Sequence, residues 1–159
     1  MIEITATKET LRYHKDRNSK VGGFLNNTLL NTRKKTMEKY FTITRDALKK
    51  KIDEGSDFVL VDVLGQGSYE QRHLPGAISI DAHASNFVKQ VEKRIPDKNE
   101  EVVVYCASFT CPLSPKAASD LTDAGYKNVV DFEGGLADWQ DAGYSFEAGK
   151  ERELAQSSA

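Results

Sequence analysis

The stretch VVVYCASFTCPLSPKAASDL, residues 102–121, places a cysteine between a strand and a helix. Its first residues form an apolar, β-branched run of the kind that a buried parallel strand needs, and the run ends at Cys106. Ser114 followed by Pro115 is a favourable helix start, with serine as the N-cap and proline in the first helical position. The sequence therefore predicts a loop over residues 106–113 that joins a strand end to a helix N-terminus.

Strand and helix signals alternate on both sides of this stretch. Thr44 is a suitable N-cap for a helix that ends at Gly55. Further strands are expected at 58–64, 77–80, 101–106 and 128–132, and further helical segments at 69–74, 85–95, 115–125 and 135–143. This order predicts a small three-layer α/β fold, with a central, mostly parallel sheet and helices on both faces. Ligands of such sheets bind beyond the carboxyl ends of the strands, where Cys106 lies.

The position of Cys106 favours a nucleophile. Backbone N–H groups in the loop and the positive end of the following helix dipole favour an anion at the loop centre. We expect the cysteine to ionise there with a lowered pKa, or its persulfide to be held there. The N–H groups expected to form this anion cradle belong to Ala107, Ser108, Phe109, Thr110 and Cys111. The alternative is a buried cysteine with a structural role only.

Charge divides the chain unevenly. Residues 1–36 hold eight Lys or Arg and three acidic residues, so they are expected to be a basic, disordered extension. The folded domain is expected over 37–148, followed by a flexible tail over 149–159. No nucleic-acid motif is present, and no apolar run approaches the ~20 residues that span a bilayer, so neither nucleic acid nor membrane is an expected partner.

Two cysteines without a secretion signal are typical of a reducing, cytoplasmic compartment. Two cysteines and three histidines in unrelated places lack the spacing of zinc ligands. We therefore expect no metal and no cofactor. The oligomeric state is left open.

Three segments resemble rhodanese-like domains in that family's order and spacing. They are DVLGQGSYEQRHLPGAISI (62–80), VVVYC (102–106) and AGYKNVVDFEGGLADWQDAG (124–143), and the resemblance covers about residues 41–147. The resemblance implies a small α/β fold and sulfurtransferase chemistry. In that chemistry the loop cysteine, Cys106 here, carries a persulfide between a sulfur donor and an acceptor.

The loop departs from the common family pattern, which has a glycine and an arginine soon after the cysteine. The first basic residue after Cys106 is Lys116, inside the predicted helix. A charge-assisted hydrogen bond contributes roughly 1.5–3 kcal/mol, so thiosulfate would bind weakly on amides alone. The expected donor is therefore a protein or small-thiol persulfide. Leu64 replaces a common family arginine, and Arg72 is a candidate for restoring positive charge near the site. The Cys-x5-Arg motif of related phosphatases is excluded, because Pro112 holds its arginine position.

The second cysteine leaves several roles open. The loop resembles a rhodanese-like subgroup with a Cys-x4-Cys loop, and Cys111 is a candidate resolving thiol, a second persulfide carrier or a small packed side chain. Asp62, at a strand end, is expected to bond neighbouring loops rather than to transfer protons. Two functions remain open: a sulfurtransferase that uses Cys106, or a non-catalytic rhodanese-like module that binds a partner or senses redox state through Cys106 and Cys111.

Overall fold

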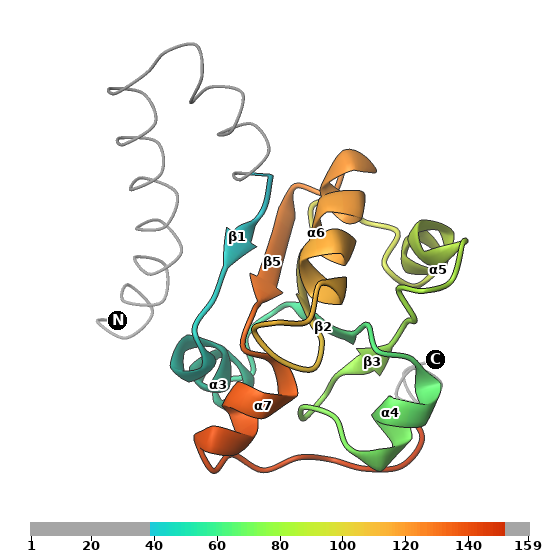
Figure 1. Ribbon diagram of the computed structural model, residues 1–159. Coiled ribbons are helices and arrows are strands. Elements are labelled where there is room, and N and C mark those ends of the chain that lie inside the picture. The colour runs from blue at the N-terminus through green and yellow to red at the C-terminus, as the bar shows by residue number, and fades with distance from the viewer. Residues whose placement is uncertain (1–38, 152–159) are drawn as a thin grey trace, which may run out of the picture.

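The computed structural model describes residues 39–151 of the chain (Figure 1). The expected extension over residues 1–36 and residues 152–159 of the expected tail lie outside the described residues. In chain order the elements are β1 (Phe41–Thr42), α3 (Arg45–Asp53), β2 (Val59–Asp62), α4 (Gln66–Gln71), β3 (Ile78–Ser79), α5 (Phe87–Arg94), β4 (Glu101–Tyr105), α6 (Leu113–Asp123), β5 (Asn128–Phe132) and α7 (Gly135–Asp141).

The strands form one sheet in the order β1-β5-β4-β2-β3, and every pairing between them is parallel. This confirms the predicted α/β class and parallel sheet. The edge strand β1 was not predicted, because two residues show no periodicity. Thr44 caps α3 as expected, since its hydroxyl accepts a hydrogen bond from the Ala47 amide at 3.3 Å.

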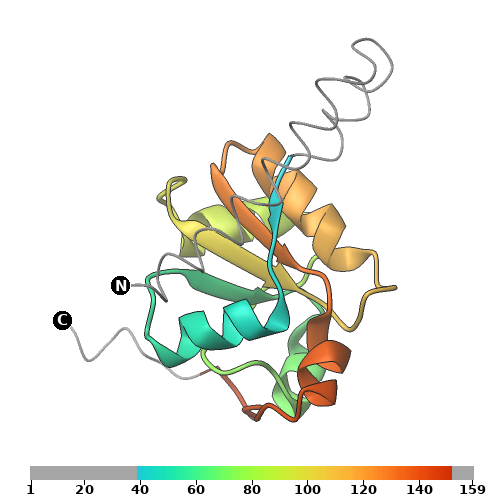
Figure 2. The same ribbon diagram turned by 90° about the vertical axis from the view of Figure 1, so that its left-hand side faces the viewer.

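Helices cover both faces of the sheet, which confirms the three layers (Figure 2). Helices α5 and α6 pack on one face, and α3, α4 and α7 pack on the other. Side chains along β4 point alternately to the two faces of the sheet and so contribute to both cores. Val102 and Val104 face α5 and α6, whereas Val103 and Tyr105 face the other layer. Cys106 continues the α6-facing row. Within residues 39–151 no helix is long and apolar enough to cross a membrane.

Candidate active site

Cys106 follows β4, the middle strand of the sheet, and its side chain is fully buried under α6. Its sulfur lies 3.3 Å from the hydroxyl oxygen of Ser114 and 3.6 Å from the carbonyl oxygen of Cys111, and the thiol can donate to either. The structure thus places this cysteine at the carboxyl edge of the sheet, as expected, but encloses it completely. In this conformation solvent has no access to the sulfur.

Ser114 is not the N-cap that the sequence suggested. Helix α6 begins at Leu113, with Pro112 at the cap position and no side chain capping the amides. Ser114 therefore lies in the first turn, where its side chain is buried and points at Cys106. The Ser-Pro signal marked the helix start to within two residues, but the hydroxyl contacts the thiol instead of the helix amides.

The two thiols have opposite pKa shifts. Burial raises the pKa of Cys106, and the hydrogen bond to the Cys111 thiol adds to that increase, while Ser114 partly offsets it. The expectation of a lowered pKa at Cys106 is therefore wrong in this closed conformation. At Cys111, burial alone would raise the pKa, but hydrogen bonds from the Cys106 thiol and from the amides of Ala107 and Leu113 outweigh it and lower the pKa. Cys111 is thus the first of the pair to ionise.

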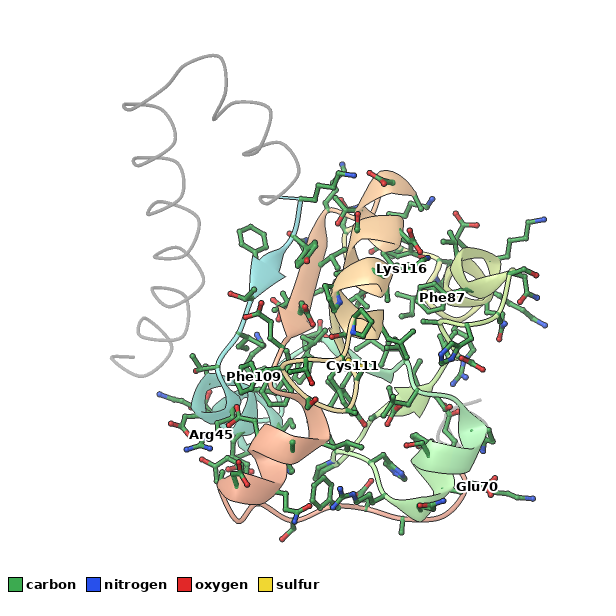
Figure 3. The ribbon with its side chains drawn as sticks, in the orientation of Figure 1. Arg45, Glu70, Phe87, Phe109, Cys111 and Lys116 are labelled. Carbon is green, nitrogen blue, oxygen red and sulfur yellow. The ribbon has the colours of Figure 1, made fainter. Side chains whose placement is uncertain are left out.

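The loop itself is compact and partly exposed (Figure 3). The Cys111 amide donates to the Ser108 carbonyl at 3.0 Å, so it is engaged within the loop. Within residues 39–151, the amides of Ser108, Phe109 and Thr110 have no hydrogen-bond acceptor. Those three amides, together with that of Ala107 beside the Cys111 sulfur, remain candidates for the anion cradle. The Phe109 ring is 69% exposed.

The beginning of α7 holds the other side of the loop. The Leu136 amide donates to the Cys106 carbonyl at 3.1 Å, and the Ala137 amide donates to the Ala107 carbonyl at 2.9 Å. Gly135 permits this approach, because it has a φ of +58° and a Cβ there would lie 2.3 Å from the Cys106 carbonyl oxygen. Helix α7 therefore fixes the position of the Cys106 and Ala107 backbone, and with it the position of the thiol.

Among residues 39–151, no Lys or Arg side chain contacts either thiol. Lys116, the first basic residue after Cys106, is exposed and forms an ion pair with Asp120 at 2.6 Å. Arg72 hydrogen-bonds Gln140 at 2.5 Å and lies over the Phe146 ring, so the structure does not bring it to the loop. Leu64 packs between the two cores. Within residues 39–151 no group of His, Cys, Asp or Glu is arranged to hold a metal ion.

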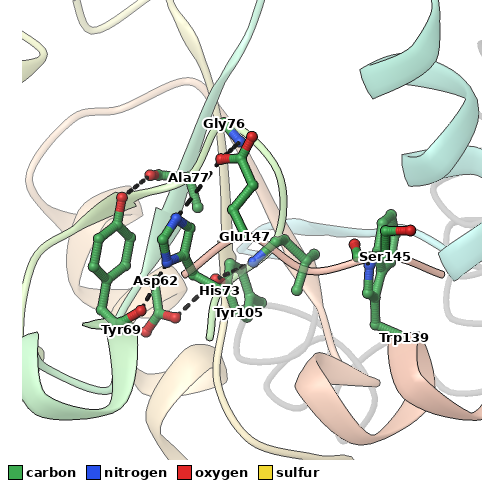
Figure 4. Close-up of polar contacts among 10 residues, drawn as sticks. Asp62, Tyr69, His73, Gly76, Ala77, Tyr105, Trp139, Ser145 and Glu147 are labelled. Carbon is green, nitrogen blue, oxygen red and sulfur yellow. Dashed lines mark hydrogen bonds and ion pairs between the residues drawn. The ribbon is translucent and has the colours of Figure 1, made fainter. Parts of the chain in front are cut away.

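Asp62 joins neighbouring segments, as expected. One oxygen of Asp62 accepts a hydrogen bond from the Leu64 amide at 2.9 Å. The other accepts from the Tyr105 hydroxyl at 2.7 Å (Figure 4), and that hydroxyl in turn accepts from the Leu74 amide at 3.1 Å. Burial raises the pKa of Asp62, and its hydrogen bonds to Leu64 and Tyr105 and the nearby His73 partly offset the increase. This network lies on the β4 face opposite Cys106, where it ties β2, β4 and the turn after α4 together.

Replacing Tyr105 with phenylalanine should cost about 2–4 kcal/mol, because it leaves a buried carboxylate oxygen and the Leu74 amide without a partner. Tyr126→Phe is a matched control, since its hydroxyl makes one hydrogen bond, to the Ile95 carbonyl, and should cost about 1 kcal/mol. Urea unfolding of both variants measures the two costs. Equal costs would show that the Asp62 network does not stabilise the fold in this way.

His73 lies after the end of α4 at Gln71, although the sequence predicted a helical segment over 69–74, and it is buried in the same region. Its ring stacks on Tyr69 with centroids 3.7 Å apart, and its Nδ1 donates to the Tyr69 carbonyl at 2.7 Å. Its backbone exchanges two hydrogen bonds with Glu147, which anchors the segment after α7. His73 lies with these groups and not with the cysteines.

Sequence analysis missed Asp131, a buried carboxylate on β5. Its side chain is fully buried, and within residues 39–151 neither oxygen meets a hydrogen-bond donor at normal geometry. Burial raises the pKa of Asp131 to about 7; nearby Ser114 offsets part of the increase and Glu133 adds to it. The sequence did offer a signal for this residue: an aspartate lies inside a strand that was predicted to be buried on both faces, where charged side chains are rare.

The pKa of Asp131 makes stability depend on pH. The pKa of Asp131 is about 7 in the folded protein and near 3.8 in the unfolded chain, so the folded state binds this proton more tightly than the unfolded state does. Stability is then lost as pH rises from about 4 to 7, by up to about 4 kcal/mol at 1.36 kcal/mol per pKa unit.

Asp131→Asn should remove this pH dependence. Urea unfolding at a series of pH values should show the variant gaining stability relative to the parent as pH rises from 4 to 7, with a constant difference above pH 7. Glu133→Gln, an exposed neighbour, is the control and should follow the parent closely. A difference between Asp131→Asn and the parent that stays the same at every pH would contradict the shifted pKa.

Comparisons with known proteins agree with the fold. A family model described as Rhodanese-like domain matches residues 44–142. YrkF of Bacillus subtilis (strain 168), a candidate sulfur carrier protein, is 30% identical over 97 residues, which are 61% of this chain and 49% of that protein. Thiosulfate sulfurtransferase PspE of Escherichia coli (strain K12) is 38% identical over 82 residues, which are 49% of this chain and 70% of that protein.

A solved structure shows the same fold. The crystal structure of the BH2092 protein from Bacillus halodurans matches with a TM-score of 0.62 at 25% identity, covering 77% of this chain and 87% of that chain. The present chain spans about half the length of the first curated relatives that it matches, 49% and 45%. The likeness to those relatives therefore concerns this domain and not their remaining parts.

Proposed function

This chain belongs to the rhodanese-like domain family, and from that premise we propose that it is a sulfurtransferase that carries sulfur as a persulfide on Cys106. The observation that supports this most directly is the placement of Cys106 at the carboxyl end of the middle strand, below a loop with unengaged amides. Relatives named as sulfurtransferases support the same class of reaction.

The proposed transfer has two displacements at sulfur. The Cys106 thiolate attacks the outer sulfur of a donor persulfide, R–S–SH; the donor S–S bond breaks, and R–S⁻ leaves as Cys106–S–SH forms. An acceptor thiolate then attacks that outer sulfur, takes it as its own persulfide and releases the Cys106 thiolate. Sulfur atoms and electrons balance within these two steps, so no external oxidant or reductant is needed.

The charges around the loop favour a persulfide donor over thiosulfate. Lys116 is paired with Asp120, and the carboxyl groups of Asp131 and Glu133 lie on the same side as the thiols. A thiosulfate dianion would meet no counter-charge from the described residues there, whereas the exposed Phe109 ring offers apolar contact to a larger donor. A protein or small-thiol persulfide is the donor class that fits these features.

Initial rates of sulfur transfer to an acceptor thiol test this choice, with glutathione persulfide and thiosulfate supplied at equal concentrations. Loss of one charge-assisted hydrogen bond corresponds to about a 10- to 100-fold weaker interaction, so the persulfide should be the better donor by at least about 10-fold. Equal or greater use of thiosulfate would contradict the proposed donor class.

A second candidate function is a thiol-redox module, which the opposite pKa shifts of the two neighbouring thiols favour. A peroxide would oxidise the Cys111 thiolate to a sulfenic acid, and the Cys106 thiol would then displace water to form a disulfide. Intact mass would show the loss of two hydrogens only when both cysteines are present. Oxidation of this kind without any sulfur uptake would replace the sulfurtransferase proposal.

A further inference from the structure

Asp131 lies on the same face of the sheet as Cys106. It pairs in register with Val104, which precedes Cys106 by two residues and faces α6 in the same row. The carboxylate is fully buried, and within the described residues both of its oxygens lack a hydrogen-bond partner. Burying a carboxylate without a hydrogen-bond partner costs free energy of folding, so a functional reason for its position should be sought.

Ser114 contacts the thiol and is a neighbour of the carboxylate. Its side chain is 1% exposed, and its oxygen lies 3.3 Å from the Cys106 sulfur. The Ser114 hydroxyl makes no hydrogen bond to Asp131 at normal geometry, but its proximity lowers the pKa of that carboxyl group, so proton transfer requires the hydroxyl to move into hydrogen-bond geometry with Asp131. A hydroxyl has one proton to donate and lone pairs to accept another, so Ser114 can receive a proton from the thiol while it gives its own to the carboxylate.

We propose that Asp131 is the proton acceptor for Cys106 and acts through the Ser114 hydroxyl. The S–H bond of Cys106 breaks as an O–H bond forms at Ser114, and the original O–H bond of Ser114 breaks as one forms at Asp131. The products are a Cys106 thiolate and a neutral Asp131 carboxylic acid, with no change in total charge. This inference rests on the proposed function, because it supplies the nucleophile that sulfur transfer requires.

The surroundings of the thiol need such an acceptor. Burial raises the pKa of Cys106, and no basic side chain lies in the loop. The groups that interact with Asp131 are the Glu133 carboxylate after β5, the Tyr40 phenol before β1, the Cys111 thiol in the loop and the Ser114 hydroxyl on α6; none is cationic. With a pKa of about 7, Asp131 changes its protonation state in the range where a general base is most effective.

The test measures how fast iodoacetamide alkylates Cys106 from pH 5 to 9, in a Cys111→Ser background so that only one thiol reacts. The alkylation rate should rise with pH in a step centred near pH 7, where Asp131 loses its proton. Adding Asp131→Asn should abolish the step and lower the rate at pH 7.5 by about 10-fold or more, within the range of general-base effects. Ser114→Ala should do the same, whereas Ser114→Thr, which keeps a hydroxyl, should retain the step.

Glu133→Gln is the matched control, because it removes one carboxylate beside Asp131 but leaves the path from Cys106 intact. The pH profile of alkylation in Glu133→Gln should keep the step, but at a slightly lower pH, because Glu133 raises the pKa of Asp131. The proposal is overturned if Asp131→Asn retains the parental profile, if it lowers the rate equally at every pH, or if Cys106 is unreactive throughout. Since alkylation needs no sulfur donor, a profile as expected without sulfur uptake would sustain the proton acceptor and reject the sulfurtransferase.

Discussion

Replacing Cys106 with serine should lower the rate of sulfur transfer by roughly 10³-fold or more, the scale of losses when a nucleophile that forms a covalent intermediate is removed. A serine hydroxyl at this position cannot hold sulfane sulfur as a persulfide. The substitution changes one atom in a site that is fully buried beside Ser114, so the fold should persist. Transfer from glutathione persulfide to an acceptor thiol measures the rate.

Cys111→Ser is the matched control. It makes the same atomic change five residues away in the same loop and removes the thiol that raises the pKa of Cys106. Uptake of sulfur should persist, because Cys106 still has its path to Ser114. If Cys111→Ser loses transfer as completely as Cys106→Ser, then the two thiols act as one unit and Cys106 alone is not the carrier.

Gly135→Ala is expected to destabilise the protein by about 2–5 kcal/mol and to reduce sulfur transfer. A left-handed conformation costs a residue with a side chain about 1–2 kcal/mol, and Gly135 has a φ of +58°. In addition, a Cβ would lie 2.3 Å from the Cys106 carbonyl oxygen and 2.8 Å from the Ala107 carbonyl carbon. Relief of that overlap moves the backbone that positions the thiol, with a further cost of about 1–3 kcal/mol.

Gly143→Ala separates the two contributions. Gly143 follows α7 with a φ of +74°, and a Cβ there would meet no atom within 4 Å. This variant should therefore lose about 1–2 kcal/mol in urea unfolding and keep its transfer rate. A Gly135→Ala variant that is no less stable than Gly143→Ala would show that the contact between α7 and the loop does not hold the site.

The fold could be predicted well from the sequence, because its signals are local. The apolar runs that became β2 and β4 and the alternation of strands with short helices fix a parallel sheet covered on both faces. The two-residue strand β1 lacked such a signal, since only its pairing with β5 defines it.

The site was predictable only in part. The carboxyl end of an apolar strand located Cys106, and Asp62 has the bonding role expected of it. The pKa of Cys106 was not predictable, because it depends on how completely α6 and the loop enclose the sulfur. Arg72 lies with Gln140 and Phe146, a placement that depends on how α4 and α7 meet.

Ser114 shows why residue type alone misleads at a helix start. A serine before a proline is a favourable cap, yet the helix begins earlier and directs this hydroxyl into the core. The same turn brings Ser114 beside Cys106 and near Asp131, which are 25 positions apart in the sequence. Proximity of that kind appears only when β4, α6 and β5 are packed together.

Intact mass after exposure to glutathione persulfide tests the central claim most directly, on the reduced parent, Cys106→Ser and Cys111→Ser. We predict that the parent and Cys111→Ser gain the mass of one sulfur and that Cys106→Ser gains none, because the persulfide forms on Cys106. A gain on Cys106→Ser that is absent from Cys111→Ser would move the carrier to Cys111, and no gain on any of the three would contradict sulfur transfer by this domain.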